Sequence, residues 1–373
     1  MTRLRYVDGS ILYQNPQPHV RSRHAFFPGL LNLPSGDLLA LLVIGEAFES
    51  ADSTTYIARS KDLGKTWKVE GPLYDKTLDV VPTSDYLKAT LLRDGSLIAM
   101  GYRFHRCDPE QSIGIGETGG ILPGDDVVSF SHDQGRTWTP PSVIPRTRPE
   151  LLEVSGPCLR SSSGDLLALA AMFRMPDGSN PSGTYGVLLR SCDAGRTWSD
   201  SETFFEMPGR NITPFEARLC QMDDNRLVAI AWAYDSRAEK SLTNHVVVSY
   251  DDGHSWSPAI DTHQTGQAAS LLPWSGDYLL VTQAHRTDQV PGIYVRVIDF
   301  GGDQWQTIVE LPIYGPGASA AAKEDQDTVR MFASLRFGQP SLLRVSESEV
   351  LATHWCIEDG LGKIRVHRLA IDL

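Results

Sequence analysis

The sequence lacks the features that mark membrane-spanning, secreted or zinc-binding proteins. No apolar run in its 373 residues is long enough to cross a membrane, and the first ten residues, MTRLRYVDGS, hold no apolar core of signal-peptide length. The cysteines are few, and none belongs to a C-x-x-C pair, so no metal site is predicted. We interpret them as reduced thiols of a cytoplasmic protein, with a secreted form that has lost its signal peptide as the alternative. They are Cys107, Cys158, Cys192, Cys220 and Cys356.

Positive charge is also scarce. Against 34 Lys and Arg there are 46 Asp and Glu, a net charge of −12 with no basic run. Nucleic acids and anionic membranes attract positive surfaces, so neither is expected as a partner. The glycine-rich GIGETGG, Gly114–Gly120, is followed by neither a helix nor a lysine, as a phosphate loop would require, and no cofactor is predicted.

The chain contains four copies of one octapeptide motif, S-x-D-x-G-x-[ST]-W. A fifth, degenerate copy is IDFGGDQW, in which Phe300 replaces the aspartate. The copies follow one another at about the length of one four-stranded sheet, which is typical of a β-propeller. The four intact copies are SKDLGKTW (Ser60–Trp67), SHDQGRTW (Ser131–Trp138), SCDAGRTW (Ser191–Trp198) and SYDDGHSW (Ser249–Trp256).

The chemistry of the octapeptide favours a turn rather than an active site. An Asp side chain can accept hydrogen bonds from amides just downstream, and the Gly supplies a positive φ angle. The Trp ring then covers the turn as an apolar plug. We therefore interpret Asp62, Asp133, Asp193 and Asp251 as structural, in hairpin turns between the third and fourth strands of a blade.

The text between the octapeptides predicts six hairpins, among them LLNLPSGDLLALLVI (30–44) and SLLRVSESEVLATHW (341–355). No segment shows sustained helical periodicity. We predict an all-β fold, a six-bladed propeller formed by residues 1–373 as a single domain. The last blade would take its fourth strand from about residues 4–13, which removes free edges. Two long loops, Arg106–Gly124 and the alanine-rich Tyr314–Leu335, are of the length that often carries binding elements.

These repeats and their spacing resemble the Asp-box, or bacterial neuraminidase repeat, proteins of the sialidase-like propeller superfamily, over nearly the whole chain. The resemblance implies an acid/base aspartate, matched by Asp52, and the glutamate of a Tyr–Glu nucleophile pair, matched by Glu216. It also implies three arginines that grip a carboxylate, of which Arg286 matches the third. The other positions depart from the pattern: Phe26-Phe27-Pro28 replaces the first arginine motif, Ala231–Trp232 the second arginine, and Gln339 the tyrosine, for which Tyr314 is an outside substitute.

The missing arginines make sialic acid a poor expected substrate, because a guanidinium fork is what holds a carboxylate bidentately. We therefore expect a protein that is sialidase-like in architecture but not a sialidase in activity.

Propeller geometry suggests the site independently. The innermost strand of each blade lines the central channel, so the rim opposite the octapeptide turns gathers the start of each first strand and the end of each second strand. Candidate catalytic residues there are Glu216, Asp52, Glu153 and Asp85. Candidate substrate-binding residues are Arg103, His105, Arg218, Trp232, Asp235, His285, Arg286, Gln339 and His354. Further polar or aromatic residues at this rim are His24, Phe26, Glu46, Glu49, Lys88, Arg106, Glu150, Arg174, Tyr234, Gln267, Arg336 and Trp355.

Each candidate carboxylate also has a structural interpretation. Glu216 could pair with Arg218 on the same strand face, and Asp85 with Lys88. Asp52 could cap a turn, and Glu153 could accept bonds from loop amides.

A mixture of carboxylates, cations and rings at one mouth is what glycoside cleavage requires. The predicted function is an exo-acting glycosidase for a small oligosaccharide or glycoside, using carboxylate acid/base catalysis. One alternative is a lyase that acts next to a uronic acid, in which His105, His285, His354 or the arginines move the proton. The other is a carbohydrate-binding propeller without catalysis.

Overall fold

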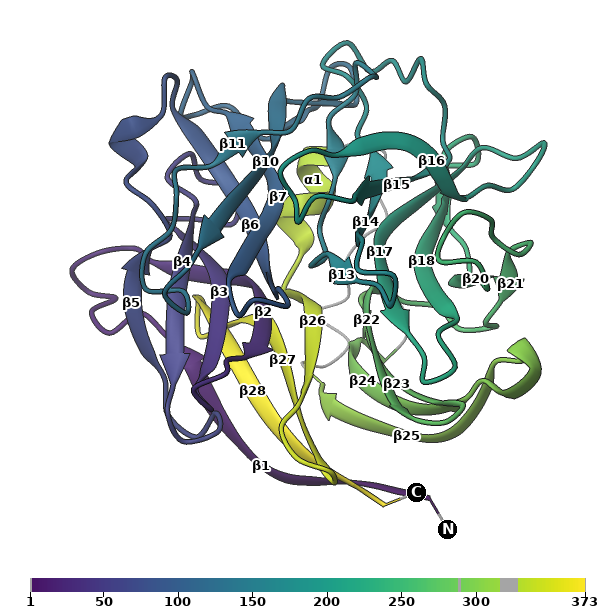
Figure 1. Cartoon of the computed structure of the whole chain (residues 1–373). Coiled ribbons are helices and arrows are strands. Elements are labelled where there is room, and N and C mark those ends of the chain that lie inside the picture. The colour runs from purple at the N-terminus through teal and green to yellow at the C-terminus, as the bar shows by residue number, and fades with distance from the viewer. Residues whose placement is uncertain (1, 288–289, 316–327, 373) are drawn as a thin grey trace.

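Six antiparallel sheets surround a central axis in the computed structural model, which describes residues 2–287, 290–315 and 328–372 (Figure 1). The fold is the predicted six-bladed β-propeller, almost entirely β. The innermost strands of neighbouring blades contact one another around the axis. The predicted connection Tyr314–Leu335 is only partly described, because residues 316–327 lie outside the described part.

Each blade runs from an innermost strand outward. Blade 1 contains β2 (His24–Asn32), β3 (Leu38–Gly45), β4 (Thr54–Ser60) and β5 (Lys68–Pro72), and blade 2 contains β6 (Thr83–Leu91), β7 (Leu97–His105), β10 (Gly124–Ser131) and β11 (Ser142–Val143). Blade 3 contains β12 (Leu152–Glu153) and β13 (Leu159–Arg160), both innermost, then β14 (Leu166–Met172), β15 (Gly186–Ser191) and β16 (Ser199–Phe205), and blade 4 contains β17 (Ile212–Gln221), β18 (Leu227–Asp235), β20 (His245–Ser249) and β21 (Ile260–Asp261), with β19 (Lys240–Ser241) beside β18. Blade 5 contains β22 (Gln267–Ser275), β23 (Tyr278–His285), β24 (Gly292–Asp299) and β25 (Gln306–Tyr314).

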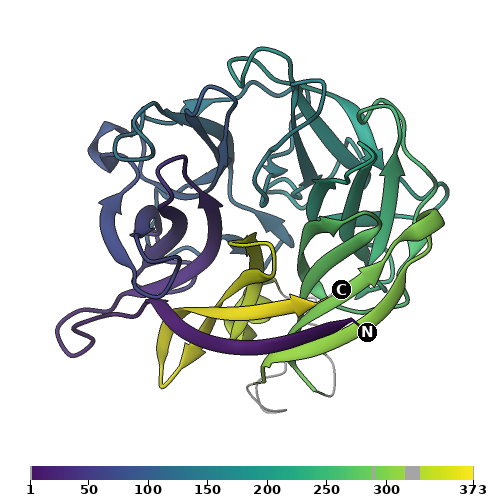
Figure 2. The ribbon, with the colours of Figure 1, turned by 60° about the horizontal axis from the view of Figure 1, so that its bottom comes forward.

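The sixth blade joins the two ends of the chain. Its order is β26 (Phe337–Arg344), β27 (Glu349–Glu358), β28 (Leu361–Asp372) and finally β1 (Arg3–Tyr13). Antiparallel pairing aligns Leu4 with Ile371, and the two terminal strands lie side by side in Figure 2. The outermost strand of this blade therefore comes from the beginning of the chain.

Shorter elements lie in the connections. A small hairpin, β8 (Gly114–Ile115) and β9 (Gly120–Ile121), forms within the loop Arg106–Gly124, and a helix, α1 (Thr328–Ser334), precedes the sixth blade. Short 3₁₀ turns occupy Lys76–Leu78 and Gly301–Asp303.

The apolar core is divided into layers between blades. Every residue of β3 is buried, and successive side chains face opposite neighbours: Ala40 and Leu42 pack toward blade 6, whereas Leu39 and Leu41 pack toward blade 2. This two-residue alternation explains why second strands read as continuous apolar runs. Full burial of each leucine contributes about 2 kcal/mol, so the interfaces between blades stabilise the ring.

The octapeptides form turns held by their own polar groups. In the first, the Asp62 carboxylate accepts bonds from the Thr66 amide (2.9 Å) and the Thr66 hydroxyl (2.6 Å), and the Trp67 Nε1–H donates to the Gly64 carbonyl (3.1 Å). The Thr66 hydroxyl and amide lower the pKa of Asp62 to about 2. The corresponding bonds recur around Asp133, Asp193 and Asp251.

The octapeptide glycines have a second function that the sequence did not reveal. Gly195 has a φ of +87°, and a β-carbon added there would collide with Ile98 of the preceding blade. Gly64 and Gly135 stand in the same relation to Leu351 and Leu39. The glycines therefore allow each turn to dock on its neighbour as well as to close.

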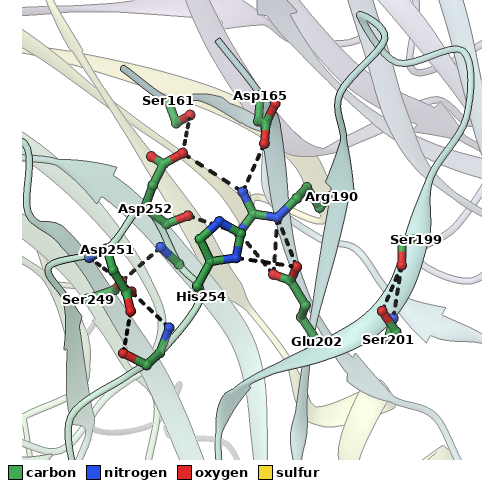
Figure 3. Close-up of polar contacts among 12 residues, drawn as sticks. Ser161, Asp165, Arg190, Ser199, Ser201, Glu202, Ser249, Asp251, Asp252 and His254 are labelled. Atoms are coloured by element: carbon green, nitrogen blue, oxygen red, sulfur yellow. Dashed lines mark hydrogen bonds and ion pairs between the residues drawn. The ribbon is translucent and has the colours of Figure 1, made fainter. Parts of the chain in front are cut away.

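Buried arginines attach several of these turns to the preceding blade. Figure 3 shows Arg190 of blade 3, whose guanidinium donates to the Asp252 carbonyl in the octapeptide turn of blade 4 (2.9 Å) and binds Glu202 (2.9 Å) and Asp165 (3.1 Å). Arg59 makes the equivalent bond to the Gln134 carbonyl (3.1 Å) in blade 2. These arginines link a backbone carbonyl across the blade interface to carboxylates of their own blade.

The degenerate fifth octapeptide keeps its packing but loses the aspartate bonds. Phe300 is fully buried in the layer between blades 4 and 5, and the Trp305 Nε1–H donates to Gln264 Oε1 (3.3 Å) instead of to its own turn. An aromatic ring thus takes the place of a polar turn.

The five cysteines form no disulfide, and all lie in the described residues; three are buried and two exposed. Within residues 2–287, 290–315 and 328–372, no helix is long and apolar enough to cross a membrane. In the same part of the chain, no group of three His, Cys, Asp or Glu side chains could hold a metal ion.

Candidate functional site

A cavity of about 480 Å³ opens at the end of the axis opposite the octapeptide turns. Its lining comes from the starts of innermost strands, the ends of second strands, the β8–β9 hairpin and α1. Five of the candidate catalytic and substrate-binding residues line it together, Glu153, Glu216, Trp232, Arg286 and Gln339, with four of the further rim residues, Glu49, Arg174, Tyr234 and Gln267.

Backbone bulges direct side chains into this cavity. The pairing of β17 with β18 shifts register between Phe215 and Arg218, and the residue in the shift, Glu216, has a φ of +46°. Phe27 (+54°) and Gln339 (+36°) occupy equivalent bulges in β2 and β26. A side chain in this conformation costs about 1–3 kcal/mol, and such strain concentrates at functional sites. The strain here turns all three side chains to the cavity.

Two glutamates from neighbouring blades meet at the floor of the cavity. The backbone amide of Glu216 donates to Glu153 Oε2 at 2.9 Å. Burial, and next the Glu216 carboxylate, raise the pKa of Glu153 to about 8. Glu153 therefore holds a proton at neutral pH, as a general acid must.

Glu216 has the surroundings of an anion. Its Oε1 accepts a bond from Gln339 Nε2 (3.2 Å), and Arg286 Nη1 lies 4.0 Å from Oε2. Oε2 is buried and has no hydrogen-bond partner among the described residues. The two glutamates thus differ: burial raises the pKa of Glu153, whereas Glu216 faces an amide donor and a guanidinium and keeps one buried oxygen without a hydrogen-bond partner.

Arg286 is held in place from behind. Its Nε–H donates to the Phe337 carbonyl (3.0 Å), and its backbone amide donates to Gln267 Oε1 (3.1 Å). A β-carbon on Gly338 would collide with the guanidinium. A glycine at 338 is therefore required for Arg286 to reach Glu216.

A smaller space of about 110 Å³ lies deeper along the axis, and Arg218 lines it rather than the main cavity. Arg218 Nη1 donates to Ser155 Oγ (3.0 Å) and to the Ala217 carbonyl (2.9 Å). The buried Lys88 shares this space and donates to the Phe27 carbonyl. The guanidinium at ion-pair distance from Glu216 is that of Arg286 rather than that of Arg218, so the Arg218 pair considered above as the structural alternative is replaced by the Arg286 contact.

Asp85, predicted as catalytic, lies outside the cavity. It is fully buried beside blade 1, where it accepts the Thr55 amide (2.8 Å) and binds Lys76 Nζ (2.7 Å). In the regular strand β6 the alternate residue Tyr86 lines the cavity instead. Asp85 and Lys88 are three positions apart and so face opposite sides of the strand, which excludes the predicted pairing.

Asp52 also lies outside the cavity lining. Its carboxylate accepts the Glu46 amide (2.9 Å) and lies 3.7 Å from Arg23, on an exposed loop. This is the turn-capping arrangement considered above as the alternative to catalysis.

The carboxylate that the same loop presents to the cavity is Glu49. Burial raises its pKa, one oxygen accepts the Ser112 hydroxyl, and the other has no hydrogen-bond partner among the described residues. The sequence places both carboxylates at the rim, and the resemblance favours Asp52 as the acid/base residue. The conformation of the loop, which the sequence does not predict, turns Glu49 toward the cavity and Asp52 to the surface.

The remaining predicted binding residues are engaged elsewhere. Arg103 and His105 both bind Asp125 (3.0 Å each). Asp235 accepts amides of its own turn, from Arg237 (3.0 Å) and Ala238 (2.9 Å). None of the three lines the cavity.

Two predicted histidines pack inside blades rather than at the mouth. His285 Nε2 lies 3.1 Å from Arg296 Nη2, and its ring packs on Tyr294. His354 is fully buried and stacks on His367 with their Nε2 atoms 3.0 Å apart. Burial lowers the pKa of His354 to about 3.

The two sides of the cavity differ in polarity. On the side of blade 4, Trp232 donates its Nε1–H to Ser241 Oγ (2.9 Å), and the hydroxyls of Thr213 and Ser236 also reach the lining. Blades 1 to 3 supply mainly aromatic and aliphatic side chains, among them Phe104 and Phe173. The rings of blades 1 to 3 have the polar neighbours Glu49, Arg174 and Asn180 in the lining, so the two sides differ in the share of polar groups rather than in their presence.

Comparison with known proteins finds likeness in structure only. No protein-family model matches the chain, and no curated protein matches it. A protein of unknown function from Dyadobacter fermentans is similar over 99% of both chains, with 19% identity and a TM-score of 0.74. An α-L-arabinanase of Penicillium chrysogenum complexed with arabinobiose is similar over 98% of both chains (15% identity, TM-score 0.65).

A third similar structure is the Hadza microbial sialidase Hz136, with 17% identity and a TM-score of 0.64. The likeness covers 92% of this chain and 65% of that one. The protein therefore has the six-bladed propeller fold found in sialidases and arabinanases, and among its structural neighbours are glycoside hydrolases.

Proposed function

We propose that the protein is an exo-acting glycoside hydrolase with Glu153 and Glu216 as its catalytic pair. This proposal rests on the hydrogen bond from the backbone amide of Glu216 to the carboxyl group of Glu153 at the cavity floor. The pKa of Glu153 is raised, and the guanidinium of Arg286 faces the carboxylate of Glu216. Glycoside hydrolysis needs such a division of roles between two carboxyl groups.

In this mechanism Glu153 donates its proton to the glycosidic oxygen as the bond to the anomeric carbon breaks. The Glu216 carboxylate stabilises the positive charge that develops at that carbon, either by attacking it or by activating the water that adds to it. Arg286 and Gln339 hold Glu216 in position. Trp232 and its neighbouring hydroxyls offer a surface for the sugar ring and its hydroxyl groups.

The lyase and binding alternatives are distinguished by the same cavity. The three histidines considered for a lyase, His105, His285 and His354, do not line it, and Arg286, which does, is held at Glu216. A protein that only binds sugars does not require a buried, protonated glutamate beside a second one, because each such group costs desolvation energy.

The test is a panel of glycosides and uronic-acid oligosaccharides, with products read by mass. Hydrolysis gives products that are one water heavier than those of elimination. Glu216→Gln and Glu153→Gln are each expected to lower turnover by at least about 100-fold, within the range of acid/base groups. Asp52→Asn, an exposed carboxylate on the same face, is the matched control and should retain activity. Full activity in either glutamate variant would refute the assignment.

A further inference from the structure

One wall of the cavity is built of aromatic rings that touch one another. We call it the aromatic wall, formed by Phe27, Phe48, Tyr86, Tyr102, Phe104 and Phe173. Ring centroids of contacting members lie 5.3–5.8 Å apart, as in Phe27–Phe48 (5.4 Å), Tyr102–Phe173 (5.3 Å) and Phe104–Phe173 (5.8 Å). The wall is a continuous surface contributed by three blades.

The aromatic wall is preformed. Its rings pack mostly edge to face, the favourable arrangement for aromatic pairs, and so support one another without a ligand. Phe27 joins it only because its backbone adopts the strained φ of +54°. A ligand that covers this surface would gain apolar burial without first having to order the rings.

The six rings of the wall themselves offer few polar partners, and the polar groups beside them in the lining are Glu49, Arg174 and Asn180. Four of its six members are phenylalanines, and the aliphatic Ile113 and Ile121 adjoin it from the β8–β9 hairpin. A sugar laid there would lose the water around its hydroxyl groups and regain few hydrogen bonds, which is costly. The floor and the blade 4 side, in contrast, carry the glutamates, Arg286 and several hydroxyls.

We propose that the cleaved glycoside carries an apolar ring as its leaving group and that this ring binds on the aromatic wall. This inference rests on the proposed function, since it divides the same cavity into a polar sugar subsite and an apolar leaving-group subsite. The bond between the anomeric carbon and the glycosidic oxygen breaks, Glu153 protonates that oxygen, and water completes the sugar. The second product is therefore an alcohol or phenol that bears the ring.

The test compares benzyl and methyl glycosides of the same sugar, across a panel of pyranosides and furanosides. The two alcohols are of similar acidity, so a difference in kcat/KM reports contact with the ring rather than leaving-group reactivity. Burying roughly 100 Å² of ring surface at about 25 cal/mol/Å² corresponds to a benzyl preference of about 70-fold.

Variants of the wall link the preference to this surface. Phe173→Ala should reduce the benzyl preference at least about fivefold, while Phe173→Leu, which keeps an apolar side chain there, should retain most of it. Tyr250→Ala, at an exposed ring remote from the cavity, is the matched control and should leave the preference unchanged.

Binding measured by calorimetry with the Glu216→Gln variant separates this inference from the proposed function. Turnover with equal kcat/KM for benzyl and methyl glycosides would overturn the apolar subsite and leave the hydrolase standing. Tighter binding of benzyl glycosides without turnover by the wild type would overturn the hydrolase and support the subsite. Neither turnover nor a benzyl preference in binding would overturn both.

Discussion

Replacing Glu153 by glutamine should abolish activity and yet stabilise the protein above neutral pH. Glutamine has the shape of a protonated glutamate, and its side-chain oxygen can still accept the Glu216 amide, which donates to Glu153 Oε2 in the wild type. The substitution therefore removes one property, the ability of this buried group to ionise.

The expected magnitude follows from the raised pKa. Burial, together with the Glu216 carboxylate, moves the pKa of Glu153 from 4.5 to about 8. Between these pH values the folded protein keeps a proton that the unfolded chain has released, so the free energy of unfolding falls as pH rises toward 8. At about 1.4 kcal/mol per pH unit, the loss reaches about 4–5 kcal/mol by pH 8.5.

The assay is urea unfolding of wild type and Glu153→Gln at pH 5 and pH 8.5. Other titrating groups are common to both proteins and cancel in the difference between them. At pH 5 the two stabilities should agree within about 1 kcal/mol, and at pH 8.5 the variant should be more stable by roughly 3–5 kcal/mol, a midpoint shift of about 1 M. The same stability difference at both pH values would show that Glu153 ionises normally, which would remove the argument for it as the acid.

Three further predictions concern other parts of the structure. Burial lowers the pKa of His354 to about 3 and that of His367 to about 4, so both stay neutral in the fold while the unfolded chain protonates them below pH 6.5. The two histidines should therefore contribute a loss of about 4 kcal/mol in stability between pH 7 and pH 5, measured by urea unfolding as the difference between the wild type and a double His→Gln variant. Gly338→Ala should displace Arg286 and lower kcat/KM at least about tenfold with little change in Tm; unchanged kinetics would mean that the guanidinium is dispensable. Arg190→Leu should cost about 2 kcal/mol in urea unfolding by leaving two carboxylates and a carbonyl without their donor, and a loss below about 0.5 kcal/mol would contradict its bridging role between blades.

The aromatic wall gives the departures from the sialidase pattern a physical interpretation. Phe27 stands in the segment where the resemblance implies the first arginine, and in the structure its ring lines the cavity. A ring in place of a guanidinium replaces a carboxylate-binding group by an apolar surface. This agrees with the expectation that sialic acid is a poor substrate, and it supports a substrate with an apolar portion.

The fold could be predicted from local patterns in the sequence. The period-two apolar runs and the octapeptide turns are local signals, since Asp62 bonds within its own turn and each second strand is buried on both faces. Local signals of this kind repeat with every blade, so six hairpins and their order could be read directly. The pairing of β1 with β28 also matches what the hairpin pattern suggested for residues 4–13.

The candidate site could be located only in part from the sequence, because strand parity and loop conformation decide which side chains reach the cavity. Glu216, Glu153 and Arg286 lie at the start of an innermost strand or just beyond the end of a second strand, where propeller geometry predicts them, and Glu216 and Arg286 also match the residues that the resemblance implies. Asp85 and Asp52 were misplaced because strand parity turned the first toward blade 1 and loop conformation turned the second to the surface.

Which of the predicted residues contact one another, and how deeply each carboxyl group is buried, depends on the tertiary structure. The distance from Glu216 to Arg286 and the burial that raises the pKa of Glu153 depend on backbone bulges and on the packing of blades around an axis. Neither feature can be predicted from a short segment of the sequence. The aromatic wall has the same origin, since its six rings come from three blades and form a surface only when the ring of blades closes.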